Sequence, residues 1–129
     1  MREEIGFRAI ENLSPVTKKE AVIESIEKAR QVKVDESLDD YILDVVRETR
    51  ESPFLELGSS PRGALALRRI SQAHAYCEGR DFLIPDDVKK NAVPALSHRV
   101  ILKSLNGDSE SVKTKKIIEE ILERVPVPI

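Results

Sequence analysis

The sequence predicts an all-α protein, a small bundle of about four to five helices, and three observations carry this prediction. Apolar residues recur at three- and four-residue spacing in several separate segments, which is the helical period. N-cap residues or prolines open these segments, and prolines or a glycine close them. Extended patterns are confined to residues 32–34 and 99–102, so we expect at most one minor two-stranded pairing, between these two segments.

The first two helices are predicted over 17–31 and 38–50, each behind a capping box. Thr17 stands three residues before Glu20, and Ser37 three residues before Asp40. One apolar face runs along each helix. The faces consist of Val22, Ile23, Ile26 and Ala29 in the first helix, and of Ile42, Val45, Val46 and Thr49 in the second. Pro53 ends the second helix, and residues 51–59 are expected to form a loop.

The remaining helices start at prolines or follow a loop. A third helix is predicted over 60–79, with Ser60 as N-cap, Pro61 in the first position and a glycine at its C-terminal end. A fourth starts at Pro85, with two acids in its first turn where the helix dipole favours them, and Pro94 is expected to break or restart it. A loop over 106–109 precedes the fifth helix, over 117–125.

The chain is long enough for one domain with its own core, at 129 residues. Residues 1–13 show no clear period, and we interpret them as a lead-in segment that is ordered in part. Residues 14–129 form the predicted domain.

The composition excludes several classes of protein. With 21 basic and 23 acidic residues the net charge is −2, whereas a protein that grips nucleic acid normally has a basic excess. No apolar run approaches the roughly 18 residues of a membrane span, and the N-terminus has no signal core. A single cysteine, Cys77, is typical of a reducing compartment, so we expect a cytoplasmic protein with neither nucleic acid nor membrane among its partners.

The sequence contains no recognisable catalytic set. There is no G-x-x-x-x-G-K-[ST] loop for phosphates. The two histidines, His74 and His98, form no metal-ligand pattern with Cys77, so we expect no metal site. Paired acids sit at helix starts or on charged faces, where capping or solvation explains them.

One arrangement favours anion binding. The run Leu-Gly-Ser-Ser-Pro-Arg-Gly-Ala over residues 57–64 places Arg62 in the first turn of the third predicted helix. Free backbone N–H groups and the positive end of the helix dipole lie there already. An arginine adds a planar charged fork that matches phosphate oxygens, and Gly58 allows close backbone approach.

The same run resembles the motif around the second sensor arginine in the MoxR branch of the AAA+ ATPases. The likeness extends, in order, over residues 34–42, 57–67, 79–88, 95–99 and 117–128. Three departures occur: Ser59 and Gly63 stand where Ala is usual, and Ile84 stands where Thr commonly caps the fourth helix. None of them displaces the arginine.

The resemblance covers only the helical lid that follows the nucleotide-binding core in that family. It implies a piece of a longer ATPase, in which residues 14–129 are the lid. Arg62 would reach the γ-phosphate of ATP, bound with Mg²⁺ by the core, and so serve catalysis there, while Ser60 and Pro61 fix the helix start on the phosphate side. The isolated chain would then hydrolyse no ATP and bind none tightly.

The resemblance also implies partners: the core domain of the same protein, neighbouring subunits of a homo-oligomeric ring, and a protein client whose remodelling is coupled to the nucleotide state. His98, Arg99 and Lys103 lie near a nucleotide or subunit face in this interpretation, although packing and solvation are the favoured explanation for them.

Two other functions stay open on the residues alone. An independent helical protein–protein adaptor would use Phe54, Leu55 and Leu57 as its contact patch. A helical DNA-binding domain would use Arg62, Arg68 and Arg69, against the acidic balance of the chain.

Overall fold

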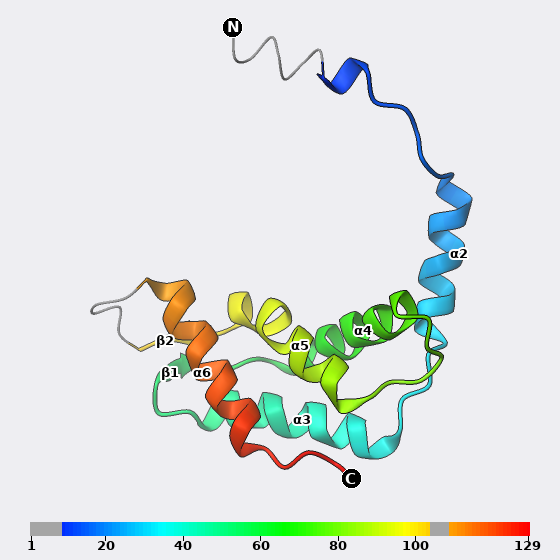
Figure 1. The fold of residues 1–129 in the computed structure, drawn as a ribbon. Helices are drawn as coiled ribbons and strands as arrows, with labels where there is room; N and C mark the ends of the chain where they lie inside the picture. Colours follow the sequence, from blue (N-terminus) through cyan, green and yellow to red (C-terminus); the bar gives the residue numbers. More distant parts are fainter. Residues whose placement is uncertain (1–8, 104–108) are drawn as a thin grey trace, which may run out of the picture.

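The computed structural model describes residues 9–103 and 109–129. It shows a helical body and an N-terminal arm, residues 9–18, that precedes the first long helix (Figure 1). Five helices of twelve residues or more are described, which confirms the all-α prediction. In chain order the elements are α2 (Lys19–Arg30), α3 (Glu36–Glu51), β1 (Leu55–Leu57), α4 (Pro61–Cys77), α5 (Pro85–Leu96), η1 (Ser97–Arg99), β2 (Ile101–Leu102) and α6 (Glu110–Arg124).

Helices α3 to α6 form the body, and α5 runs back along α4 (Figure 1). All four bury one apolar face in a common core, because a helix face of this kind is stable only against another element. Among the fully buried side chains are Val45 of α3, Leu67 of α4, Leu96 of α5 and Ile118 of α6. The core therefore fixes α4 between its neighbours.

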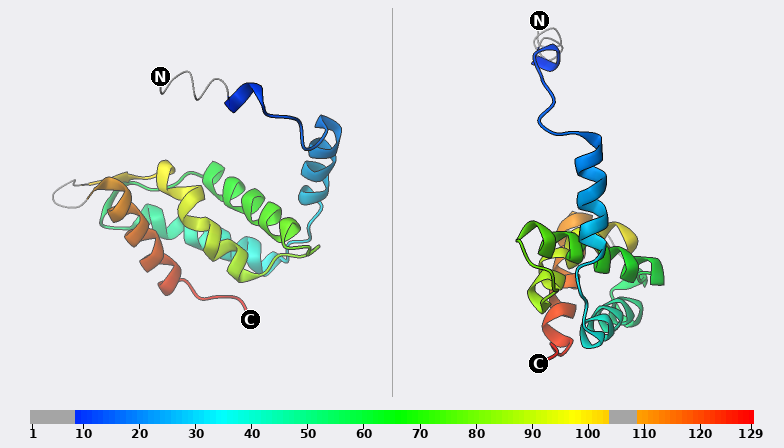
Figure 2. Two further views of the ribbon diagram at one scale, coloured as in Figure 1. Left: turned by 45° about the horizontal axis from the view of Figure 1, so that its top comes forward. Right: turned by 90° about the vertical axis from the view of Figure 1, so that its right-hand side faces the viewer.

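Helix α2 rises from one end of the body, and the arm extends beyond it (Figure 2). None of its residues is buried. The predicted apolar face exists, but Val22, Ile23 and Ile26 are each about half exposed. The predicted capping box is wrong, because the helix starts at Lys19 and no side chain caps it. The apolar face of α2 is thus only partly covered, and α4 is the helix that it contacts.

Helix α3 begins two residues before the predicted start. The carboxylate of Asp35 accepts hydrogen bonds from the backbone N–H and the hydroxyl of Ser37, at 2.9 and 2.6 Å. Asp35 is therefore the N-cap, and Ser37 lies inside the helix. The bonds to Ser37 also lower the pKa of the Asp35 carboxyl.

The predicted pairing of 32–34 with 99–102 is wrong, because each of these segments pairs with a different part of the chain. Strand β2 pairs antiparallel with β1, in the register Leu55↔Leu102 and Leu57↔Ile101. Lys33 instead forms a single bridge to Phe82. Because α5 returns along α4, the 81–83 segment reaches the α2 end of the body, while β2 lies at the opposite end (Figure 1).

The ends of the later helices differ in detail from the prediction. Gly79, at φ +77°, closes α4 in a Schellman motif, with the N–H of Arg80 bonded to the carbonyl of Ala75. Pro94 does not break α5, which continues to Leu96. Helix α6 starts at Glu110, seven residues before the predicted boundary, and most of the predicted 106–109 loop lies outside the described residues.

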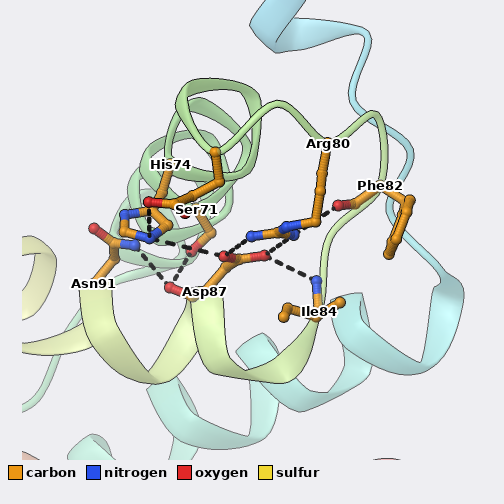
Figure 3. Close-up of polar contacts among 8 residues, drawn as sticks. Ser71, His74, Arg80, Phe82, Ile84, Asp87 and Asn91 are labelled. Atoms are coloured by element: carbon orange, nitrogen blue, oxygen red, sulfur yellow. Dashed lines mark hydrogen bonds and ion pairs between the residues drawn. The ribbon is translucent and has the colours of Figure 1, made fainter.

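A buried ion pair ties the end of α4 to the start of α5 (Figure 3). Arg80 donates to both oxygens of Asp87, at 2.6 and 2.8 Å, and the N–H of Ile84 donates to the same carboxylate at 2.9 Å. Burial raises the pKa of Asp87, but the bonds from Arg80 and Ile84 and the charges of Arg80 and His74 outweigh it and lower the pKa. Ile84 has no side-chain cap to offer, as the sequence predicts, so at this helix start only the reciprocal bond forms, from the N–H of Ile84 to the Asp87 carboxylate.

Candidate functional site at the start of helix α4

The loop before α4 lies directly on the backbone of α3. A Cβ atom on Gly58 would stand 2.5 Å from the backbone nitrogen of Arg50 and 2.6 Å from the carbonyl carbon of Thr49. Any side chain would push the loop away, so glycine is required for this approach. The loop position is consequently set by the last turns of α3.

Thr49 fastens the loop to that helix. Its hydroxyl is fully buried, accepts a hydrogen bond from the N–H of Ser59 at 2.9 Å and donates one to the carbonyl of Val46 at 2.6 Å. The sequence places Thr49 on the apolar face but does not reveal this role. A lone hydroxyl residue at the end of an apolar stripe is the one signal that could have indicated it.

Ser59 and Gly63, two of the three departures from the family pattern, share one space: the Ser59 side chain fills the place next to Gly63. Ser59 is fully buried. A Cβ on Gly63 would overlap the Ser59 Oγ and stand 3.2 Å from the Ser59 Cβ and 3.4 Å from Leu96. The extra oxygen of Ser59 therefore fills the place that a methyl group at position 63 would take, which explains why the two residues differ from alanine together.

Helix α4 starts where the sequence predicts. Ser60 is the N-cap, in an extended conformation, and Pro61 is the first helical residue. The Ser60 hydroxyl makes no capping hydrogen bond, and the first turn contains no acidic residue. The positive end of this helix dipole is therefore neutralised neither by a side-chain cap nor by an acidic residue of the first turn.

Arg62 adds its charge to that positive end. It is exposed, and none of the described residues forms an ion pair or side-chain hydrogen bond with it. Arg68, two turns on, is instead held by Asp39 at 2.7 Å and by Gln72 at 3.3 Å. The first turn of α4 thus joins a free guanidinium to a helix N-terminus, an arrangement that an anion from outside the chain would neutralise.

The other residues singled out from the sequence lie elsewhere. Arg99 donates to the carbonyl of Ala95 at 3.0 Å and so covers the end of α5. His98 is exposed in η1, and Lys103 follows β2. Of the predicted adaptor patch, Phe54 and Leu57 are exposed at 62% and 56%, whereas Leu55 is buried.

Within residues 9–103 and 109–129, no group of three histidine, cysteine or acidic side chains could hold a metal ion. No helix in the same residues is long and apolar enough to cross a membrane.

Comparison with known proteins identifies the class. Residues 47–121 match the family described as the AAA lid domain, and the chain belongs to this family. It is 38% identical to YeaC of Bacillus subtilis, described as uncharacterized, over 93% of its length. It is 28% identical to the chaperone MoxR1 of Mycobacterium tuberculosis over 74% of its length. The similar proteins thus include one named as a MoxR chaperone.

The structural comparison agrees. The crystal structure of a presumed ATPase from Cytophaga hutchinsonii superimposes on 98% of this chain, with a TM-score of 0.80 and 30% identity. The chain spans only 43% of that protein, 37% of YeaC and 27% of MoxR1. The similarity therefore concerns a part of each of these longer proteins.

Proposed function

We propose that Arg62 is the second sensor arginine of a MoxR-type AAA+ ATPase and contacts the terminal phosphate of ATP bound by the core domain. One observation carries the proposal: Arg62 is exposed and unpaired in the first turn of α4. None of the described residues supplies a counter-charge to Arg62, and a polyphosphate would supply it.

The residues at the start of α4 fit a phosphate group. Arg62 and the uncapped first turn of α4 would hold phosphate oxygens, while Ser60 and Pro61 set the helix start from which Arg62 projects. The described residues offer no acidic cluster for Mg²⁺, so the core domain would hold the ion. ATP supplies the phosphoryl group that is transferred to water.

Arg62 would act by electrostatic stabilisation. Negative charge spreads over the phosphate oxygens during hydrolysis, and the Arg62 guanidinium would stabilise that charge. The loop before it is held by Thr49 and Gly58, so the arginine starts from a defined backbone position. Such pre-organisation is what a sensor of the third phosphate requires.

The same contact would couple the nucleotide state to the orientation of the lid. The buried pair of Arg80 and Asp87 joins α4 to α5, and the common core joins both helices to α3 and α6. A shift of α4 toward phosphate would therefore move the body as a unit. In a homo-oligomeric ring this movement would reach the core domain and the neighbouring subunits, and through them a protein client.

We place this activity in the cytoplasm, because the single cysteine, Cys77, is exposed and free.

The DNA-binding alternative has less support from the structure than from the sequence. Of its three arginines, Arg68 is engaged by Asp39 inside the chain.

The test is steady-state ATP hydrolysis by the longer ATPase that carries this lid. The variant Arg62→Ala should lower kcat about 100-fold, the usual effect of removing one preorganised donor to a transition state. Arg69→Ala is the matched control, since Arg69 is exposed on the same helix but lies outside its first turn. Unchanged turnover in Arg62→Ala, with an unchanged unfolding temperature, would refute the role.

A further inference from the structure

A second site lies at the end of the body where β1, β2 and α6 meet. It is a pocket of about 390 Å³, a volume typical of ligand sites. Phe54, Leu102 and Ile117 supply its apolar lining. This end of the body is opposite the end that carries α2 and the arm (Figures 1 and 2).

The pocket is lined by an exposed aromatic ring and by residues of a small buried apolar cluster. The register of the two strands puts Leu55 opposite Leu102, and both are buried together with Val100. Ile117 of α6 packs against this cluster. Phe54, the next residue before β1, is 62% exposed even though the cluster lies beside it. An exposed aromatic side chain at the mouth of an apolar pocket is typical of an interaction site.

Three lysines surround this apolar lining. Lys103 follows β2, and Lys113 and Lys116 come from α6. Lys103 and Lys116 are exposed and have no acidic partner among the described residues. Elsewhere on α6, Lys115 lies 3.8 Å from the carboxylate of Glu119. Among the described residues that line the pocket, Glu120 is the one acidic residue, and the exposed Lys103 and Lys116 bring two positive charges beside it on a chain whose net charge is negative.

We propose that this pocket binds a short acidic peptide segment of a partner protein, with one apolar side chain against Phe54 and flanking Asp or Glu residues beside Lys103 and Lys116. The charge around the pocket is complementary to such a segment. A nucleic acid fits less well, because proteins that bind it normally carry a basic excess, whereas this chain has a net charge of −2. The proposal is independent of Arg62 and of ATP.

The test begins with a phage-displayed library of random heptapeptides selected on the chain. Enrichment of peptides with an apolar residue between Asp or Glu residues is expected, and enrichment of neutral or basic peptides, or of none, would overturn the proposal. A fluorescein-labelled selected peptide then measures affinity by fluorescence polarisation. Raising NaCl from about 50 to about 300 mM should weaken binding several-fold, since exposed charges are screened.

Substitutions in the pocket test whether the selected peptide binds there. Lys103→Glu/Lys116→Glu should weaken the affinity at least tenfold, and Phe54→Ser should do the same without changing charge. Lys18→Glu/Lys19→Glu is the control, because it makes the same change in net charge on exposed lysines at the other end of the molecule. Equal affinity in all variants would overturn the proposal. So would displacement of the peptide by a single-stranded DNA oligonucleotide at lower concentration than by unlabelled peptide.

Discussion

The pairing of Ser59 with Gly63 predicts a non-additive effect on stability. Replacing Gly63 by Ala in an open helix position would stabilise the protein by about 1 kcal/mol, because Ala is the better helix former. Here the new methyl group would overlap the Ser59 hydroxyl and stand 3.4 Å from Leu96. Overpacking of this kind costs about 1–3 kcal/mol. Gly63→Ala alone should therefore be neutral or destabilising by up to about 2 kcal/mol.

In the presence of a second substitution, Ser59→Ala, the change Gly63→Ala should stabilise the protein. The Ser59 hydroxyl makes one long hydrogen bond, of 3.4 Å, to the carbonyl of Ser60, so Ser59→Ala alone should cost no more than about 0.5 kcal/mol. In Ser59→Ala/Gly63→Ala the methyl group takes the space of the missing oxygen, and the gain from helix propensity returns. The coupling free energy should then be about 1–3 kcal/mol in favour of the double variant.

Urea unfolding of the four proteins, with m-values compared, measures this cycle. Additivity of the two single effects within about 0.5 kcal/mol would refute the claim that one space is shared. A double variant less stable than Gly63→Ala would refute it as well.

Three further predictions concern stability. Asp87→Asn should lower the free energy of unfolding by about 3–5 kcal/mol, since it leaves Arg80 without its buried partner. Because the folded-state pKa of Asp87 is lowered, its contribution to the free energy of unfolding is present above about pH 4 and is lost as the pH falls through the folded-state pKa. The free energy of unfolding of Asp87→Asn should therefore fall less steeply than that of the unchanged protein as the pH is lowered. Tyr41→Phe should stabilise by about 1 kcal/mol, because no described residue forms a hydrogen bond with the buried Tyr41 hydroxyl, and an unchanged or lower Tm would contradict this. Gly79→Ala should destabilise by about 1–2 kcal/mol in chemical unfolding, as φ is +77° there; a neutral result would contradict the assigned turn.

Local signals predicted the helices well. The start of α4 was found because Ser60 and Pro61 favour an N-cap and a first helical residue, whatever the rest of the chain does. The start of α3 was placed too late, since both Asp35 and Ser37 are good caps and only the structure shows which of them accepts the bond. The start of α2 has no cap at all, so Thr17 was a misleading signal.

Contacts between distant segments were not predictable in the same way. The partner of β2 depends on the end of the bundle to which α5 returns, and short apolar segments carry no information on that. For the same reason the sequence placed Arg62 in a first helical turn but did not show that Thr49 and Gly58 fasten the loop before it. The supporting residues of the site belong to another helix, and only tertiary packing reveals them.

The central claim is that Arg62 contacts the phosphate that distinguishes ATP from ADP. The most direct measurement is the ratio of ATP to ADP affinity, by titration of fluorescent nucleotides into the longer ATPase with and without Arg62→Ala. A hydrogen bond to a charged group contributes about 1.5–3 kcal/mol, so the ratio should fall about 10- to 150-fold, with the affinity for ADP unchanged. An unchanged ratio, or an equal loss of affinity for both nucleotides, would contradict the account.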